Sequence, residues 1–251
     1  MRTLAIIPAR YASTRFPGKP LAQIGNKPMI QHVYEHVARS GAADDVLVAT
    51  DDERIADAVE TFGGKAMVTI GNHRSGTDRC AEALARMGEQ FDVVINVQGD
   101  EPMVSAEQLR ALKEAFHDPA TQIATLMKRI EDTESLMSRN VVKVVCDAHG
   151  RALYFSRQPI PCQRDAREEE WATRHDYYKH VGLYAFRADT LARVAALPQG
   201  TLEKAESLEQ LRWLENGIPI TVRETTAENL SVDTPQDLQR ITLLMQSPHN
   251  K

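Results

Sequence analysis

The sequence predicts one α/β domain over residues 1–251, with a mostly parallel sheet flanked by helices and an antiparallel flap at about 122–187. Through the first 116 residues, short apolar runs alternate with amphipathic stretches of helical period, as is typical of buried parallel strands joined by crossover helices. After about residue 120, strand-like runs follow one another with few long helices between them, which favours antiparallel pairing. The 251 residues suffice for one large domain with an inserted subdomain.

The first half of the chain is predicted to hold four strands, each followed by a helix. Pro28 suits the first position of a helix because its φ is fixed, and Gly41 suits the end of that helix. The pair Gly63-Gly64 stops the second helix. Right-handed crossovers bring the carboxyl ends of parallel strands to one edge, outside which ligands bind. We expect strands at 4–7, 46–49, 66–70 and 93–97, and helices from residue 28 towards 41 and at 54–62, 77–87 and 106–116.

The second half is predicted to mix flap strands with returning helices. The segment 163–179 is dense in charge, which favours a solvated excursion over a subunit contact. We expect strands at 123–129, 141–146, 152–155, 180–186 and 220–223, and helices at 188–196, 203–215 and 235–244.

Composition excludes several classes of protein. Hydrophobic residues make up 42% and charged residues 26%, which is typical of a globular chain rather than a disordered one. A net charge of −5 offers no basic field for nucleic acid, although a local cationic cluster can still hold a small anion. Three scattered cysteines indicate a reducing compartment. Because no apolar run is long enough for a signal or a membrane span, we expect a cytoplasmic protein with no membrane partner.

A cationic loop follows the first predicted strand. Arg10, Arg15 and Lys19 lie within it, and Gly18 lets the backbone approach a ligand closely. Such cations, together with backbone N–H groups, predict a cradle for polyphosphate. The loop matches neither the Walker A pattern nor G-x-G-x-x-G. The alternative is an ordinary surface loop whose cations are solvated.

Two aspartates follow strand-like runs. Asp100 ends the fourth predicted strand within Gln98-Gly99-Asp100-Glu101-Pro102, and Asp233 precedes a helix that Pro235 opens. Carboxylates at this edge, beside a phosphate loop, suit Mg²⁺, which takes oxygen ligands and bridges phosphates. The alternatives are a turn carboxylate at Asp100 and a helix cap at Asp233.

Other polar residues carry weaker signals. Ser75 opens the third predicted helix and either contacts a base or ribose or caps that helix. His180 and Tyr184 share one face of a predicted strand. An aspartate of Thr50-Asp51-Asp52 is expected to cap the second helix, in preference to a catalytic role. The sequence shows no catalytic triad and no zinc spacing, and His73 and His175 are expected on the surface.

Six motifs carry a resemblance to a known family. The first resembles the signature of the sugar-acid cytidylyltransferases, and the set is similar to the branch of that family that acts on 3-deoxy-manno-octulosonate (Kdo). The motifs span residues 6–238: Pro8-Ala9-Arg10-x-x-Ser13-x-Arg15-x-Pro17-Gly18-Lys19-Pro20-Leu21, Asn96-Val97-Gln98-Gly99-Asp100-Glu101-Pro102, Tyr154-Phe155-Ser156-Arg157, His180-Val181-Gly182-Leu183-Tyr184, Ser207-Leu208-Glu209-Gln210-Leu211-Arg212 and Val232-Asp233-Thr234-Pro235.

The resemblance implies a nucleotide-diphospho-sugar transferase fold (Rossmann-like), Mg²⁺ dependence and a homodimer. It implies transfer of CMP from CTP to Kdo, with release of pyrophosphate, for lipopolysaccharide synthesis. Asp100 and Asp233 would hold the metal and, with Arg10 and Lys19, form the catalytic set. CTP would be bound by Pro8, Ala9, Arg10, Ser13, Arg15, Lys19, Ser75 and Gln98, and the sugar acid by Gln98, Arg157, His180, Tyr184, Glu209 and Gln210.

Three alternatives stay open. The first is a cytidylyltransferase for another sugar acid, such as 8-amino-Kdo or a sialic acid. The second is a noncatalytic nucleotide-binding protein, which the presence of Lys19, Asp100 and Asp233 disfavours. The third is a glycosyltransferase, which usually carries an Asp-x-Asp pair at a strand end where this chain has Asp100-Glu101-Pro102.

Overall fold

The computed structural model describes residues 1–13 and 15–246, which form two compact units. Among these residues, unit 1 comprises those of 1–113 and 228–246, and unit 2 comprises Glu114–Ala227. Unit 2 contains the segment 122–187 that was expected to form a flap, and extends beyond it on both sides. Across the described ranges, we find no helix that combines the length and the apolar character needed to cross a membrane.

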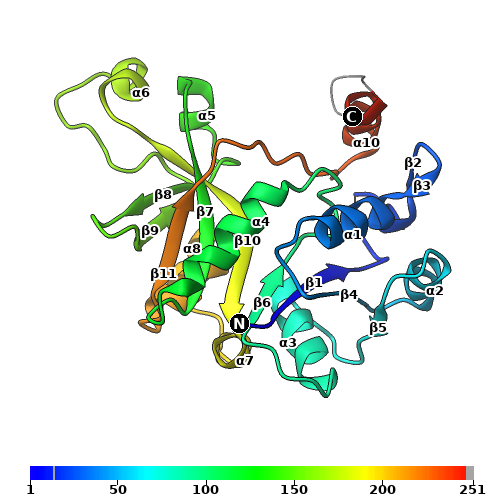
Figure 1. Ribbon diagram of the computed structural model, residues 1–251. Helices are drawn as coiled ribbons and strands as arrows, with labels where there is room; N and C mark the ends of the chain where they lie inside the picture. The colour runs from blue at the N-terminus through cyan, green and yellow to red at the C-terminus, as the bar shows by residue number, and fades with distance from the viewer. Residues whose placement is uncertain (14, 247–251) are drawn as a thin grey trace. The chain divides into compact units, whose positions relative to one another are not determined.

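Unit 1 is built on a parallel sheet with the strand order β6-β1-β4-β5 (Figure 1). The central strand, β1, is buried over almost all of its length, as its continuous apolar run predicts. The strands are β1 (Thr3–Ala9), β4 (Asp45–Thr50), β5 (Ala66–Val68) and β6 (Val93–Asn96). The parallel part of the predicted fold is therefore confirmed, with β5 shorter than expected.

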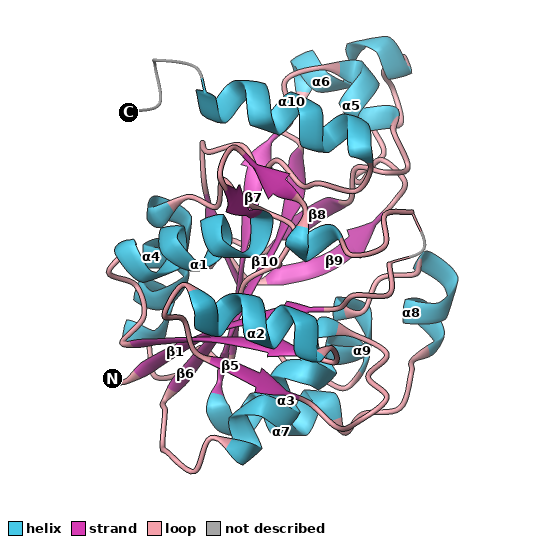
Figure 2. Ribbon diagram, turned by 90° about the vertical axis from the view of Figure 1, so that its right-hand side faces the viewer, coloured by secondary structure: helices cyan, strands magenta, loops and turns pink. Residues whose placement is uncertain are grey.

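Helices cover both faces of this sheet. The chain runs outward from β1 through α1 (Met29–Arg39) and α2 (Glu53–Thr61), then returns through α3 (Gly76–Arg86) to β6 on the other side of β1. Figures 1 and 2 show α1 and α2 over one face and α3 over the other. The reversal makes the carboxyl ends of β1 and β6 a topological switch point, where open α/β sheets bind ligands. The helix α4 (Ala106–Glu114) follows β6.

Short elements connect these strands and helices. The loop after β1 ends in a 3-10 helix over Lys19–Leu21, followed by the small hairpin β2 (Gln23–Ile24) and β3 (Lys27–Pro28). Pro28 precedes α1, and Gly41, at φ 70°, follows it as predicted.

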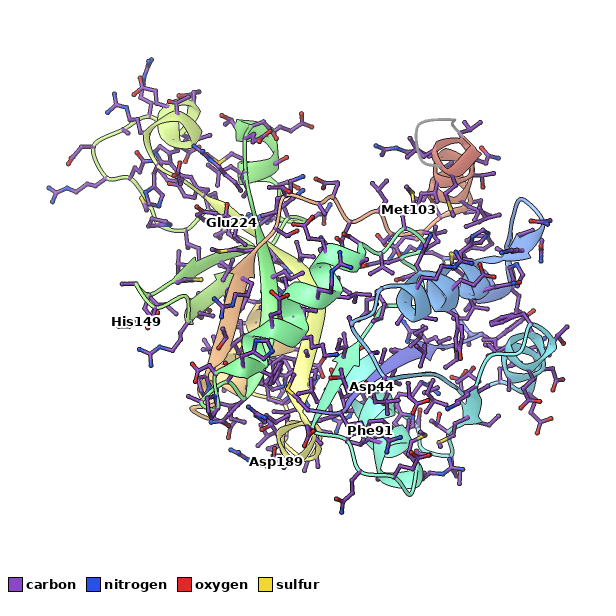
Figure 3. The ribbon with its side chains drawn as sticks, viewed as in Figure 1. Asp44, Phe91, Met103, His149, Asp189 and Glu224 are labelled. Atoms are coloured by element: carbon purple, nitrogen blue, oxygen red, sulfur yellow. The ribbon has the colours of Figure 1, made fainter. Side chains whose placement is uncertain are left out.

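The C-terminal segment returns to unit 1 and ends in α10 (Pro235–Gln246). Val232 and Ile241 pack with Ile24 and Met29 in a small apolar cluster. Met103, labelled in Figure 3, packs against the same cluster. This packing fixes the position of the residues that precede α10.

Unit 2 holds the antiparallel strands. The strand β7 (Ile123–Arg129) pairs antiparallel with β10 (Tyr178–Arg187) and parallel with β11 (Ile220–Glu224). The strand β8 (Lys143–Cys146) pairs antiparallel with β10 and with β9 (Ala152–Ser156), and His149 lies in the turn between β8 and β9 (Figure 3). The antiparallel part of the prediction is confirmed. The remaining elements before residue 200 are α5 (Thr133–Met137), α6 (Trp171–Arg174), α7 (Ala188–Ala195) and 3-10 helices over Ala115–His117 and Glu168–Glu170.

Two expectations for this half need correction. The single helix predicted at 203–215 is wrong: the structure has α8 (Thr201–Glu206) and α9 (Gln210–Glu215), because Ser207 takes a left-handed φ of 54°. The charged segment 163–179 is solvated at Arg164, but Trp171 and Tyr177 anchor it through buried rings that stack on each other.

Candidate functional site

A pocket of about 280 Å³ opens in unit 1 beside the carboxyl ends of β1 and β6. It is lined by every residue that the sequence assigned to the nucleotide or the metal: Pro8, Ala9, Arg10, Ser13, Arg15, Lys19, Ser75, Gln98, Asp100 and Asp233. The predicted convergence of these residues is therefore confirmed. Their individual roles stay predictions.

The loop after β1 folds back on itself around Tyr11. The Tyr11 carbonyl accepts hydrogen bonds from the backbone N–H groups of Ser13 and Gly18, at 3.0 and 2.9 Å. Gly18 has a φ of 69°, and a Cβ there would lie 3.1 Å from the Tyr11 ring, so only glycine fits without strain. Arg10 is exposed, whereas Lys19 is 9% exposed. The alternative of an ordinary solvated loop is therefore wrong for Lys19.

Lys19 lies between the two predicted metal ligands. Its Nζ is 2.7 Å from Asp100 Oδ2 and 3.4 Å from Asp233 Oδ1. The guanidinium of Arg15 lies 3.1 Å from the same Asp233 oxygen. One ammonium thus reaches both carboxylates, which is the arrangement that a single shared cation requires.

Backbone contacts hold the two aspartates together. Val232 N donates to Asp100 O at 2.9 Å, so the chain before α10 is tied to the residue that follows β6. The helix cap of α10 is Thr234, whose Oγ1 accepts from Asp237 N at 3.2 Å. The capping alternative is therefore wrong for Asp233, whose carboxylate faces cations instead.

The pair of carboxylates fits a hard divalent cation. Within residues 1–13 and 15–246, no group of three or more His, Cys, Asp or Glu side chains forms a metal cluster. Mg²⁺ is usually held by only one or two carboxylates, because waters and substrate phosphates complete its shell. Two carboxylate oxygens within reach of one nitrogen, in a pocket lined by three basic residues of the cationic loop, meet that description.

Glu101 does not belong to this carboxylate pair. Burial, followed by the charge of Asp100, raises the pKa of Glu101 to about 8, and its Oε2 accepts from Asn229 Nδ2 at 2.7 Å. The protonated carboxyl is a poor ligand for a cation.

The start of α3 forms another wall of the pocket. Ser75 Oγ accepts from Asp78 N at 3.2 Å, so this residue caps the helix as well as lining the pocket. Close packing at Pro8 requires small neighbours: a Cβ at Gly99 would lie 2.9 Å from the Pro8 carbonyl oxygen, and one at Gly76 would lie 3.1 Å from Pro8 Cγ. Ser75 and Gln98, the two wall residues assigned to CTP, therefore each neighbour a glycine that packs closely against Pro8.

Basic residues of this wall that carried no predicted role include His73 and Arg79. His73 was expected on the surface, yet it lines the pocket, its side chain is 7% exposed, and its Nε2 lies 2.9 Å from Glu82 Oε2. Arg79 also lines the pocket, and its Nη2 is 2.9 Å from Asp51 Oδ2. The proximity of both residues to Ser75 was the available signal. By contrast, Asp52 caps α2 and His175 is exposed, as predicted.

His180 and Tyr184 lie together in unit 2, as predicted, with ring centroids 5.3 Å apart. His180 Nε2 is 3.0 Å from Thr125 Oγ1. Burial lowers the pKa of His180 to about 3, so the imidazole is neutral at physiological pH. Burial, followed by the charge of Glu209, raises the pKa of Tyr184 well above its usual value. These groups thus offer neutral hydrogen-bonding atoms.

Glu209 and Gln210 lie at the start of α9 rather than within a longer helix. Arg157 was expected to face the sugar acid, but its guanidinium donates to three backbone carbonyls: those of Arg139, Glu206 and Ser207. Gln98 is the one predicted sugar-acid residue that belongs to unit 1.

Comparison with known proteins gives consistent results. A family model for cytidylyltransferases matches residues 4–236. The 3-deoxy-manno-octulosonate cytidylyltransferase of Phocaeicola vulgatus is 56% identical over 243 residues, 96% of each chain. That of Bacteroides thetaiotaomicron is 57% identical over 242 residues, covering 95% of this chain and 96% of the relative.

A solved structure is also similar over almost its full length. It is a CMP:2-keto-3-deoxy-manno-octonic acid synthetase complexed with CTP, 44% identical, with a TM-score of 0.90 and 98% of each chain covered. The 4-diphosphocytidyl-2C-methyl-D-erythritol synthase of Anaerococcus prevotii, 16% identical with a TM-score of 0.64 over 98% of this chain and 99% of its own, shares the fold. With the family model spanning 4–236 and relatives more than half identical over nearly the whole length, the chain belongs to the cytidylyltransferase family.

Proposed function

We propose that this protein transfers CMP from CTP to Kdo, which gives CMP-Kdo and pyrophosphate. The observation that carries the proposal is the pocket of unit 1, where Lys19 lies between two carboxylates beside Arg10 and Arg15. Such a site suits a triphosphate and a divalent cation. The names of the two curated relatives and of the CTP complex support CTP and Kdo as the substrates.

The proposed chemistry is an in-line displacement at the α-phosphorus of CTP. The anomeric hydroxyl of the sugar acid forms the new O–P bond and loses its proton, and the bond from the α-phosphorus to pyrophosphate breaks. Lys19, Arg10 and Arg15 neutralise the charge of the phosphates and of the departing pyrophosphate. The local cations reverse the sign of the field inside the pocket, which lets a protein of net charge −5 bind two anions.

Asp100 and Asp233 are proposed to hold Mg²⁺. A bound Mg²⁺ supplies charge neutralisation at the phosphates and acidifies a hydroxyl that it contacts. The contribution of this chain is to present two ionised oxygens, and Lys19 keeps them together until the cation and the nucleotide bind.

The residues proposed to contact the sugar acid are Gln98, His180, Tyr184, Glu209 and Gln210, and Arg157 is proposed to support this site through its hydrogen bonds to backbone carbonyls. The neutral imidazole of His180 and the buried phenol of Tyr184 suit the hydroxyl groups of a sugar, because a hydroxyl both donates and accepts. We further propose that the enzyme is a cytoplasmic homodimer that serves lipopolysaccharide synthesis.

The proposal is tested by pyrophosphate release. CTP, UTP and ATP are each assayed with Kdo, 8-amino-Kdo and a sialic acid, with Mg²⁺ present. We expect turnover with CTP and Kdo above every other pair. Equal turnover with UTP would contradict the assignment of the nucleotide, and faster turnover with 8-amino-Kdo or a sialic acid would favour the alternative cytidylyltransferase activity.

A further inference from the structure

We propose that Arg157 and Glu206 form a clamp that holds the turn at Ser207 and thereby positions Glu209 and Gln210. In this arrangement Arg157 is a positioning residue, and Glu206 is a second positioning residue that no motif in the sequence singled out. The kinetic consequences rest on the proposed function, because they assume that Glu209 and Gln210 contact the sugar acid.

The turn at Ser207 needs support from its surroundings. Within the described residues, Ser207 is the only one other than glycine with a positive φ, at 54° with ψ 48°. A serine side chain disfavours this left-handed conformation, which persists only where neighbouring contacts fix it. The turn ends α8 and is followed by Glu209 and by Gln210, the first residue of α9, which is 5% exposed.

The side chain of Arg157 hydrogen-bonds to backbone carbonyls of the turn. Its Nε donates to Glu206 O at 2.7 Å, and its Nη2 donates to Ser207 O at 3.3 Å. Its Nη1 donates to Arg139 O at 3.0 Å, which fixes the plane of the guanidinium. The planar, branched guanidinium reaches three carbonyls at once, which a lysine ammonium on a single stem reproduces poorly.

Glu206 closes the clamp from the other side. Its carboxylate accepts from Ser156 Oγ at 2.7 Å and from Arg157 N at 2.9 Å. The side chain that ends α8 is thus bonded to the end of β9, and the side chain that follows β9 is bonded to the end of α8. This reciprocal pairing ties the turn to the sheet of unit 2.

A buried lysine supports the base of the clamp. Lys143, which is fully buried, donates from Nζ to Arg157 O at 2.6 Å, to Val141 O at 2.6 Å and to Ser138 O at 2.8 Å. All three ammonium protons are directed at backbone oxygens, and one of these bonds fixes the backbone of Arg157, from which the guanidinium extends.

The clamp predicts that a second substitution can rescue the loss of Arg157, whereas direct binding of the ligand by Arg157 does not. If Arg157 acts by holding a left-handed turn, replacing Ser207 with glycine removes the need for the clamp, because glycine adopts positive φ freely. If Arg157 acts only by binding the substrate carboxylate, Ser207→Gly has no bearing on its loss. Rescue of Arg157→Ala by Ser207→Gly therefore separates the two roles.

The kinetic test compares Arg157→Ala, Arg157→Lys, Glu206→Gln, Ser207→Gly and the double variant Arg157→Ala with Ser207→Gly. We expect the first three to raise KM for Kdo by about tenfold with KM for CTP within about twofold, Ser207→Gly to resemble the wild type, and the double variant to recover most of the loss. Absence of rescue, together with a Glu206→Gln variant that behaves as wild type, would overturn the proposal.

The second measurement needs no substrate, so it separates this proposal from the proposed function. Hydrogen exchange of the amides of residues 207–212 is followed in the free protein, with the amides of α7 as an internal reference. We expect exchange about tenfold faster in Arg157→Ala and Glu206→Gln, and near the wild-type rate in the double variant. Unchanged exchange in both single variants would overturn the clamp, even if Kdo proved to be the substrate.

Discussion

The two units of this protein prepare for their ligands in opposite ways. In unit 1, ionised groups face an open pocket: Lys19 lies within hydrogen-bonding distance of both Asp100 and Asp233, and the side chain of Arg15 remains 66% exposed. In unit 2, the predicted ligand-binding groups are neutral and at least half-buried, as at His180 and Tyr184, or bonded to backbone, as at Arg157.

This difference indicates which interaction each unit would use to bind its proposed ligand: charge in unit 1 and preorganised hydrogen bonds in unit 2. Under the proposed function, unit 1 would recognise a triphosphate with a divalent cation by charge, and its side chains would hold one another only until these stronger partners replace them. A sugar acid presents mostly hydroxyl groups, so its proposed binding by unit 2 would depend more on preorganised hydrogen-bonding atoms than on charge. We therefore expect charge-neutralising substitutions to act on turnover in unit 1, and geometric or pH perturbations to act on unit 2.

The largest effect is expected at the two carboxylates. Asp100→Asn and Asp233→Asn each keep the shape but remove a charge, and we expect turnover to fall by at least about 10³-fold. EDTA should abolish turnover of the wild type, and added Mg²⁺ should restore it. Turnover is measured across a magnesium titration, with circular dichroism to monitor folding.

The matched control is Asp92→Asn, which changes an exposed aspartate of unit 1 outside the residues that line the pocket. Wild-type rates for folded Asp100→Asn and Asp233→Asn at low magnesium would contradict the two-carboxylate metal site.

The next largest effect is expected at Lys19. Lys19→Met keeps the length of the side chain and should lower turnover by about 10²- to 10³-fold, because an ammonium beside the phosphates is lost. Since Lys19 is buried between two carboxylates, the variant should also melt at a lower temperature without Mg²⁺ and regain stability when Mg²⁺ is added. Pyrophosphate release and melting curves check both effects, with the exposed Arg39→Met as control. Near-normal turnover would show that the loop is not the phosphate cradle.

A smaller effect, confined to unit 2, is expected from pH. The pKa of His180 is about 3 in the folded protein and near 6.5 in an unfolded chain. Between these values the unfolded chain binds a proton that the folded protein does not, so stability falls as pH decreases from about 6.5 towards 3. The slope has a limit of about 1.4 kcal/mol per pH unit.

Urea unfolding from pH 7 to pH 4 measures this dependence. His180→Gln should flatten the loss of stability, whereas His149→Gln, an exposed histidine in the turn between β8 and β9, should not. Identical pH profiles for the wild type and His180→Gln would contradict a buried neutral imidazole.

The smallest effect compares a helix cap in each unit. Ser75 caps α3 in unit 1 and Asp132 caps α5 in unit 2, each by accepting a backbone N–H. Both alanine variants should lose about 1 kcal/mol of stability. Only Ser75→Ala should also raise KM for CTP, by a few-fold, because Ser75 lines the pocket. Chemical denaturation and steady-state kinetics check the pair, and an equal change in KM for CTP in both variants would contradict the assignment of Ser75.

Most elements of the fold were predictable because their signals are local. The continuous apolar run of β1 and the Pro28 and Gly41 boundaries of α1 each depend on a few neighbouring residues. The break at Ser207 was not predictable, because serine has no intrinsic preference for a left-handed φ and the contacts that hold the turn come from Arg157, 50 residues away.

The residues of the pocket also include some that local sequence predicts and some that it does not. Arg10, Arg15 and Lys19 were found because they are close in sequence and follow a strand. His73 was missed because its burial beside Glu82 depends on how the chain before α3 packs on that helix, which a lone histidine in a sequence does not reveal. The capping alternative at Asp233 failed because its neighbour Thr234 caps α10 instead.

The sequence by itself determined most of the segments that form strands and helices, which edge of the parallel sheet carries the cationic loop, and which residue types could hold a triphosphate. These follow from periodicity, from Gly and Pro, and from the rule that parallel strands end on one edge. Only the tertiary structure decided that Lys19 reaches Asp100, 81 residues away, and Asp233, 214 residues away. The physical reason is that this convergence depends on side-chain packing around Val232 and a backbone hydrogen bond to Asp100, which no local pattern encodes.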